Sequence, residues 1–311
     1  MEINGDPIEI RASHINPYLI DGPDIFIVKR SQKAGPISPM LNLVDSGSMP
    51  LDGGNLIINT REEYDKAMSD SVAAKYVRPF RMGKELINNI GRWCLWLNDA
   101  EPNELRNSSY LREKIKACRE YRENAPVKGD AYKHRTTPWL FRDDHQQDTN
   151  YLAIPKVFSE DREYMTCDWY TPDIIAGDMV YTCIDPKGLA FAIIESSMFM
   201  VWQKTVGGRL ESRCRFSNTV VWNNLPLPEL SDDMRIKVIE AGRGVLAARA
   251  NHPGQSLADL YDPDFMPVDL RKAHEALDKV VDVAFGAKKP CRSNDERLTL
   301  LFANYAALTN Q

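Results

Sequence analysis

The sequence predicts an α+β protein in which a mixed-sheet domain, residues 1–228, precedes an all-α helical bundle domain, residues 229–311. Two observations support this fold class. Before residue 228, apolar runs of strand length are bounded by Gly, Pro, Asn and Asp, as they are between strands joined by tight turns. After it, the apolar residues take helical spacing, and capping residues and glycines separate three long segments.

The composition is that of a globular protein. Hydrophobic residues make up 43% of the chain and charged residues 27%, and no run of about 18 apolar residues predicts a membrane span. The first 20 residues lack a basic-then-apolar signal pattern. The six cysteines form no CxxC pair and have no zinc spacing with the five histidines, which predicts reduced thiols in a cytoplasmic protein.

The charge distribution argues against a general nucleic-acid coat but is compatible with a sequence reader. The net charge of the whole chain is −5. Residues 200–216, however, carry four cations against one glutamate, a local charge of +3. A local basic segment of this kind is what a sequence-specific DNA-binding protein requires.

Local patterns place the first elements. Asp52, Gly53 and Gly54 form a tight turn that enters a strand, and Thr60 with Glu63 makes a capping box for a helix that runs to about residue 74. The other expected elements are strands at 15–20 and 25–28 joined by a turn at 21–24, strands at 92–97 and 151–157, and a charged helix at 103–124.

The charged helix at 103–124 allows two interpretations. Its cations either lie near DNA phosphates or form a solvated face with i,i+4 ion pairs. The cations concerned are Arg112, Lys114, Lys116, Arg119 and Arg122. In the C-terminal part, Ser231 and Ser293 are expected to cap helices, and Arg271, Lys272 and His274 are expected at the surface.

Residues 195–229 combine an apolar helix with a strongly charged segment. Ser196 or Ser197 is expected to cap the helix, and Gly207 with Gly208 to end it, because glycine enters left-handed conformations without steric cost. A polar, hairpin-like segment follows, then a buried strand at 219–222 that prolines end. In an extended chain one face would hold Arg209, Glu211, Arg213 and Arg215.

The pattern of the charged segment leaves two interpretations open. The first is a solvated edge strand whose charges pair with one another. The second is base readout, in which Arg donates two hydrogen bonds to guanine O6 and N7 and Glu accepts one from cytosine N4.

Several ordered segments resemble the MmeI-like (type IIL/IIG) restriction–modification enzymes. These are single-chain proteins with a nuclease, an N6-adenine DNA methyltransferase and a target recognition domain. The matching segments are DGGNL at 52–56, RWCLWL at 92–97, GRLESRCRFSNTVVWNNLPLPE at 208–229 and HPGQSLADLYDP at 252–263. The resemblance spans roughly residues 14–308, with conservative departures at Cys214, Trp222, Leu225 and Leu227.

The resemblance implies that residues 1–228 form the DNA-reading target recognition domain and residues 229–311 the C-terminal helical domain. Its partner is then double-stranded DNA. Carried over by position, Glu211 accepts from a cytosine amino group, while Arg213 and Arg215 donate to guanines or phosphates. The other implied DNA-binding residues are Arg209, Lys204, Asn218 and, from a second variable segment of the family, Met179.

Motifs of the methylation chemistry are absent from the sequence. An N6-adenine methyltransferase needs a Gly-rich loop and an Asn/Asp-Pro-Pro-Phe/Tyr clamp for the flipped adenine, and neither occurs. We therefore expect no catalytic centre, cofactor or metal in this chain. The resemblance implies a methyltransferase domain, in the same or a partner chain, that binds S-adenosylmethionine (SAM).

Two other functions remain open. The chain is either an interaction module whose helical tail docks on a methyltransferase, with only non-specific DNA contact, or a stand-alone metal-dependent hydrolase. The hydrolase would use Asp143, Asp144 and His145. It is disfavoured because the flanking residues are loop-like and no third ligand has the spacing that metal sites require.

Overall fold

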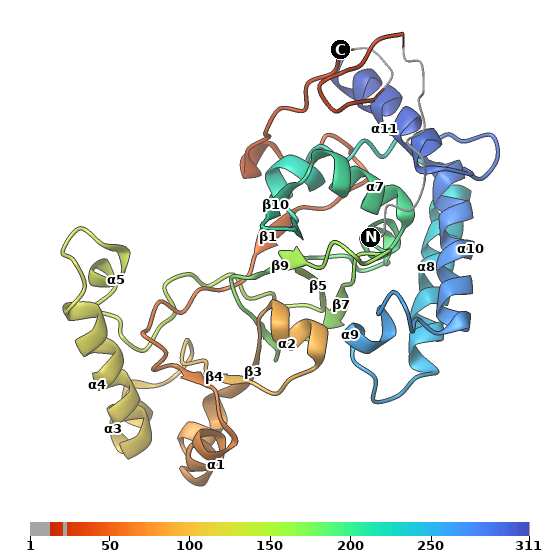
Figure 1. The fold of residues 1–311 in the computed structure, drawn as a ribbon. Coiled ribbons are helices and arrows are strands. Elements are labelled where there is room, and N and C mark those ends of the chain that lie inside the picture. The colour runs from red at the N-terminus through yellow and green to blue at the C-terminus, as the bar shows by residue number, and fades with distance from the viewer. Residues whose placement is uncertain (1–12, 21–23, 311) are drawn as a thin grey trace.

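The computed structural model describes residues 13–20 and 24–310. Small sheets alternate with short helices in the first two thirds of the chain, and the longest helices, α8 and α10, lie side by side in the last third (Figure 1). This confirms the predicted α+β fold with a helical C-terminal part. No helix of the described residues is long and apolar enough to cross a membrane.

Three sheets are formed by the described residues, with strand orders β1-β9-β5-β7, β10-β11-β6 and β2-β4-β3-β8. The strand pairs are antiparallel except β3–β8, which is parallel. The strands are β1 (Val44–Ser46), β2 (Ile57–Ile58), β3 (Val77–Arg81), β4 (Trp93–Leu95), β5 (Tyr151–Pro155), β6 (Val157–Phe158), β7 (Asp168–Tyr170), β8 (Ile175–Ala176), β9 (Val180–Cys183), β10 (Gly208–Leu210) and β11 (Arg213–Arg215).

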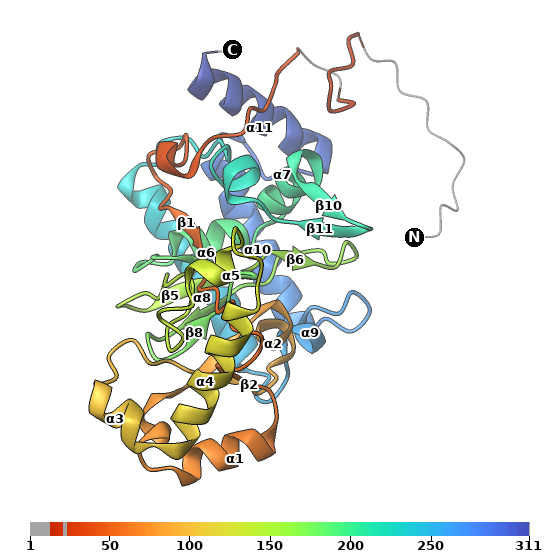
Figure 2. The same ribbon diagram turned by 90° about the vertical axis from the view of Figure 1, so that its left-hand side faces the viewer.

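The α-helices are α1 (Arg61–Ser69), α2 (Gly83–Asn88), α3 (Pro102–Asn107), α4 (Ser109–Glu123), α5 (Asp130–Lys133), α6 (Leu189–Ile194), α7 (Ser197–Val206), α8 (Asp232–Ala250), α9 (Leu257–Leu260), α10 (Val268–Ala284) and α11 (Asn294–Thr309). Two 3₁₀ turns, η1 (Gln32–Ala34) and η2 (Ala73–Tyr76), and one π-helix, η3 (Asn218–Trp222), complete the regular structure of the described residues. Helices α3, α4 and α5 form a lobe at the end of the molecule away from α11 (Figures 1 and 2).

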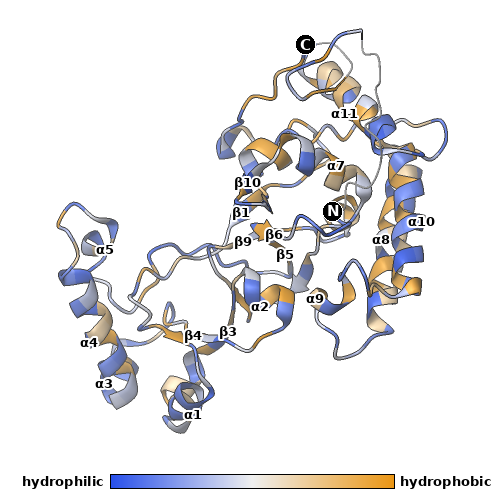
Figure 3. Ribbon diagram, viewed as in Figure 1, coloured by the Kyte–Doolittle hydropathy of each residue, from blue (hydrophilic) through white to orange (hydrophobic). Residues whose placement is uncertain are grey.

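One hydrophobic core extends across the predicted boundary at residue 228. Strand β5 and helix α6 are buried along their whole lengths, and the same core cluster includes residues of α7, α8, α10 and α11. Trp202 of α7 lies 5.9 Å from Phe302 and 6.0 Å from Tyr305 of α11, measured between ring centroids. Helices α8 and α10 carry hydrophobic and hydrophilic residues in alternation, as helices with one buried face do (Figure 3).

A buried ion pair joins the two parts of the chain. Arg249 of α8 donates from Nη2 to Glu195 Oε1 at 2.6 Å, and their side chains are 8% and 0% exposed. Arg249 also donates to the backbone oxygen of Cys167 and to the hydroxyl of Tyr261. The carboxylate of Glu195 accepts from the backbone N–H of Cys167. These hydrogen bonds satisfy both charges, which burial without partners would penalise heavily.

The predicted surface position of His274 is wrong, because its face of α10 packs on α8 and the end of α6. The ring is fully buried and stacks on Tyr164 with centroids 4.0 Å apart. Burial lowers the pKa of His274 to about 3, so the ring is neutral at pH 7. Its Nδ1 donates to the backbone oxygen of Glu195, and its Nε2 accepts from the Tyr261 hydroxyl.

Two strand predictions near the N-terminus fail. The side chain of Asn16 accepts hydrogen bonds from the backbone N–H groups of Tyr18 and Ile20, which closes a turn inside the segment predicted as a strand at 15–20. The segment 25–28 runs without ladder pairing. The turn predicted at 21–24 lies mostly outside the described residues.

Two further elements differ from the predictions. The strand expected at 219–222 is the π-helix η3, in which the Ser217 hydroxyl accepts from the N–H of Val220 and Asn224 donates to the oxygens of Thr219 and Val220. The helix expected at 103–124 is divided into α3 and α4, because Ser108 ends the first and caps the second through Leu111 N–H.

The buried ion pair gives a first prediction. Arg249→Met removes the partner of a fully buried carboxylate and should lower the free energy of unfolding by about 3–5 kcal/mol in urea titrations. The matched control is Arg271→Met, which breaks an exposed pair with Glu163 and should cost about 1 kcal/mol or less. Equal, small losses in both variants would show that Glu195 does not depend on Arg249.

Candidate nucleic-acid interface

The charged segment forms a β-hairpin, as its pattern predicted. β10 pairs with β11 through a two-residue turn at Glu211 and Ser212, and β11 pairs with β6 on its other side. Glu211 has φ 57°, the left-handed conformation that tight hairpin turns require. The turn places the Glu211 side chain at the tip of the hairpin.

Strand β11 alternates between the core and solvent. Cys214 and Phe216 are 1% exposed, whereas Arg213 and Arg215 are exposed. The Phe216 ring lies 5.3 Å from the ring of Tyr181 and 5.8 Å from that of Phe199, both edge-to-face. These ring contacts hold the buried face of the strand against the core, so that its two arginines point to solvent from the other face.

The prediction that all four charged residues share one face is wrong for Arg209. In the hairpin register Arg209 lies opposite Cys214, and Leu210 lies opposite Arg213. Directly opposed residues point to the same side of a sheet, so Arg209 lies on the face opposite to Arg213 and Arg215. The guanidinium of Arg209 donates to the backbone oxygen of Ser212 at 2.9 Å and braces the turn.

The charges at the hairpin tip are loosely paired. Arg213 Nη2 donates to Glu211 Oε2 at 2.9 Å, with side chains 49% and 80% exposed. An ion pair this exposed contributes about 0–1 kcal/mol, so both groups can exchange it for another partner. Glu160, next to β6, also faces the hairpin, and a hydrogen bond from Ser212 together with the charges of Arg209 and Arg213 lowers its pKa.

Lys156, a cation that sequence analysis did not single out, borders the hairpin. Its backbone N–H donates to the oxygen of Met179 and its backbone oxygen accepts from Phe216, so it links the turn before β9 to β11. Its Nζ donates to Ser46 Oγ at 2.7 Å and lies 4.3 Å from the Tyr181 ring centroid. Burial lowers the pKa of Lys156, with a further contribution from Arg215, while Asp178 opposes it.

Lys156, Asp178, Met179 and Arg215 therefore form one group beside the hairpin. Met179 is 39% exposed. A signal for Lys156 does exist in the sequence, where it is a single cation within the otherwise apolar run Tyr151 to Phe158. Strand pairing was needed to bring Lys156 next to Asp178, 22 residues further on.

The two remaining predicted DNA-binding residues differ in exposure: the Asn218 amide is bonded within the protein, whereas Lys204 is exposed. The side-chain oxygen of Asn218 accepts from the Tyr181 hydroxyl, and its amide nitrogen donates to Gln32 Oε1 and to the oxygen of Val44. Its amide is thus engaged inside the protein, which favours a role in positioning η3. Lys204 is exposed at the end of α7, with Nζ 3.4 Å from the backbone oxygen of Arg162.

Helix α7 continues into the hairpin through Gly207, for a reason other than the predicted one. Ser196 caps the helix by accepting from Phe199 N–H, as predicted. Gly207, however, has φ −75° and ψ 152°, which is extended rather than left-handed. A Cβ there would lie 2.4 Å from the backbone oxygen of Gln203, so close approach is what requires glycine.

The residues proposed for a hydrolase are engaged elsewhere. Asp143 pairs with Arg142, Asp144 accepts from Asn98, and His145 lies 3.6 Å from Asp45. Among the described residues no group of three or more His, Cys, Asp or Glu side chains is arranged to hold a metal ion. The three residues are therefore placed as parts of ordinary surface pairs.

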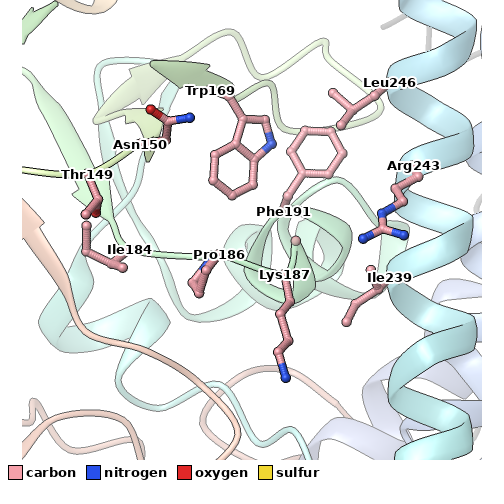
Figure 4. A pocket seen from close by; sticks show the side chains of 11 residues that line it. Thr149, Asn150, Trp169, Ile184, Pro186, Lys187, Phe191, Ile239, Arg243 and Leu246 are labelled. Carbon is pink, nitrogen blue, oxygen red and sulfur yellow. The ribbon is translucent and has the colours of Figure 1, made fainter. Parts of the chain in front are cut away.

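A pocket of about 610 Å³ lies apart from the hairpin, between the β7 and α6 region and helix α8. Figure 4 shows Trp169 and Phe191 beside each other on one side and Arg243 and Ile239 approaching from α8. Its lining contains the cations Lys187 and Arg243 but no carboxylate or histidine. The lining therefore combines aromatic and aliphatic side chains with two cations.

Two family models match consecutive parts of this chain. They are described as the MmeI target recognition domain, over residues 21–229, and the MmeI C-terminal domain, over residues 230–311. The hairpin thus lies in the part that matches a target recognition domain. The chain belongs to the MmeI family.

Two relatives are similar to this chain over almost its whole length. DNA methyltransferase A of Bacillus subtilis (strain 168) is 36% identical over 301 residues, which are 96% of this chain and 33% of that protein. The solved structure of the Type IIL restriction-modification enzyme MmeI in complex with DNA matches with a TM-score of 0.90 at 37% identity, covering 99% of this chain and 40% of that one. The chain therefore spans well under half the length of either relative.

The connection from α7 to the hairpin gives a second prediction. Gly207→Ala should lower the free energy of unfolding by about 1–3 kcal/mol, because the new methyl group overlaps the backbone of Gln203. Gly208→Ala, one residue later, meets no atom within 4 Å and serves as the control. Urea unfolding of both variants checks the difference, and equal stability would show that α7 tolerates a side chain at Gly207.

Proposed function

We propose that this chain reads a short DNA sequence and directs an N6-adenine, SAM-dependent DNA methyltransferase of a restriction–modification system to it. The observation that carries the proposal is the hairpin with Glu211 at its tip and Arg213 and Arg215 outward, anchored by buried Cys214 and Phe216. The family match and the close likeness to MmeI, whose solved structure is a complex with DNA, support it.

The geometry of β11 suits base readout. Side chains at i and i+2 on one face of a strand are about 6.6 Å apart. Two base-pair steps of a duplex rise about 6.8 Å, since each strand carries one phosphate per 3.4 Å of helix axis. Arg213 and Arg215 can therefore address bases two steps apart from a two-stranded ribbon, an element that the major groove admits.

The roles divide by chemistry. Glu211 accepts from a cytosine amino group, and the two arginines donate to guanine or to phosphates. Lys156 and Asp178 supply one donor and one acceptor beside Arg215, and Met179 offers an apolar contact such as a thymine methyl group accepts. Lys204 and Arg209 lie outside this face and suit phosphate contacts.

The methylation chemistry belongs to a catalytic portion that is separate from these residues. In this proposal that portion binds SAM and flips the adenine, and the present chain fixes which adenine is presented. The hairpin side chains would therefore determine which DNA site the assembled enzyme prefers. Substituting them would change the site but not the methylation reaction itself.

A charge exchange at the hairpin tests the proposal. Glu211→Lys with Arg213→Asp should change the base pair preferred at one position by about 1–3 kcal/mol, while binding to some sequence persists. Competition binding with duplexes that differ at single positions measures this. The control is Glu275→Lys with Lys279→Asp, the same exchange on exposed residues of α10, which should leave the preference unchanged. Equal loss on every sequence would assign the hairpin pair to phosphate or structural roles.

A further inference from the structure

Helix α4 separates its cations into two groups. Arg122 is fully buried and donates to the backbone oxygens of Pro50, Leu51, His134, Thr137 and Leu140. Lys114 pairs with Glu63 at 3.1 Å. These two cations tie α4 to the segments packed against it, and they are not available to a ligand.

The other three cations form a stripe on one side of α4, which we define as Arg112, Lys116 and Arg119. Their spacing of four and three residues places them in line along the helix, and all three are exposed. Within the described part of the chain, no carboxylate lies within 4 Å of Arg112 or Arg119. Lys116 has a long pair of 3.8 Å with Glu120, both well exposed.

The surroundings of the stripe add to its positive charge. It borders a hollow of about 430 Å³ whose lining also includes Arg106 of α3 and the apolar Leu105, Ile115 and Trp139, and no carboxylate. The stripe lies on the lobe at the end of the molecule away from α11 (Figures 1 and 2). Four cations therefore converge on one surface without an acidic neighbour in the lining.

We propose that this stripe is a second DNA contact, which binds the phosphates of one strand outside the sequence read by the hairpin. From Arg112 to Arg119 the helix rises about 10 Å at 1.5 Å per residue. One DNA strand carries about three phosphates over that length of the duplex axis, at 3.4 Å of axis each. Three unpaired or weakly paired cations thus face about three phosphates.

The inference rests on the proposed function, which brings a duplex to this chain. A phosphate contact adds affinity and fixes orientation without changing which bases are preferred. The apolar part of the hollow would also suit an acidic amphipathic helix of a protein. If a protein helix occupies the hollow, removing the stripe should not change DNA binding. One experiment therefore separates a protein helix from DNA phosphates as the ligand.

The experiment measures DNA affinity of the 311-residue chain on a 40-base-pair duplex at several salt concentrations. The variant is Arg112→Ala, Lys116→Ala, Arg119→Ala. Each lost phosphate contact reduces the slope of log K against log salt by about 0.9, so the full stripe predicts a reduction of about 2.7. Base preference, measured by competition, should stay that of the wild type.

The matched control is Lys237→Ala, Lys272→Ala, Lys279→Ala, which removes the same charge from exposed residues of α8 and α10. It should leave the slope nearly unchanged. An equal reduction in both variants would mean that only net charge matters. An unchanged slope in the stripe variant would mean that the stripe does not contact phosphates. Either result overturns the inference.

A different result would contradict the proposed function: a wild-type chain that shows no base preference at all. The slope comparison then still tests the stripe on non-specific DNA. Urea unfolding of the stripe variant should match that of the wild type, since its three side chains are exposed.

Discussion

The buried ion pair between Glu195 and Arg249 is the interaction on which the arrangement of the two parts depends. It sits where β7, the end of α6 and helices α8 and α10 meet, and its hydrogen bonds extend to Cys167 and Tyr261. In a charge pair this deeply buried, either partner is costly to leave without the other. The C-terminal helices therefore form part of the same hydrophobic core as α7, and the hairpin follows α7 directly.

Packing contacts with that core position the hairpin. Helix α7 packs Trp202 against Phe302 and Tyr305 on one side, while Phe199 contacts Phe216 beneath β11 on the other. The side chains proposed to read bases thus stand on rigid elements, which specific recognition requires. By contrast, the stripe of Arg112, Lys116 and Arg119 lies on a separate lobe, which suits contact with a backbone whose sequence does not matter.

The sequence correctly predicted the features that depend on interactions between residues close together in the chain. The Ser196, Ser231 and Ser293 caps, the Asp52 turn and the in–out alternation from Arg213 to Phe216 are as expected, because each depends on neighbours in the chain. Burial of His274, the π-helix at 218–222 and the group around Lys156 depend on partners tens of residues away, which spacing alone does not reveal. The DNA-binding roles of the predicted residues stay predictions.

The most direct test of base readout by the hairpin is a selection of random duplex DNA by the 311-residue chain at two salt concentrations, followed by sequencing. Base readout by the hairpin predicts an enriched motif of a few base pairs that persists at the higher salt, since base contacts do not depend on counterion release as phosphate contacts do. Binding without enrichment, lost as salt rises, would contradict it and leave the hairpin as a contact to phosphates alone.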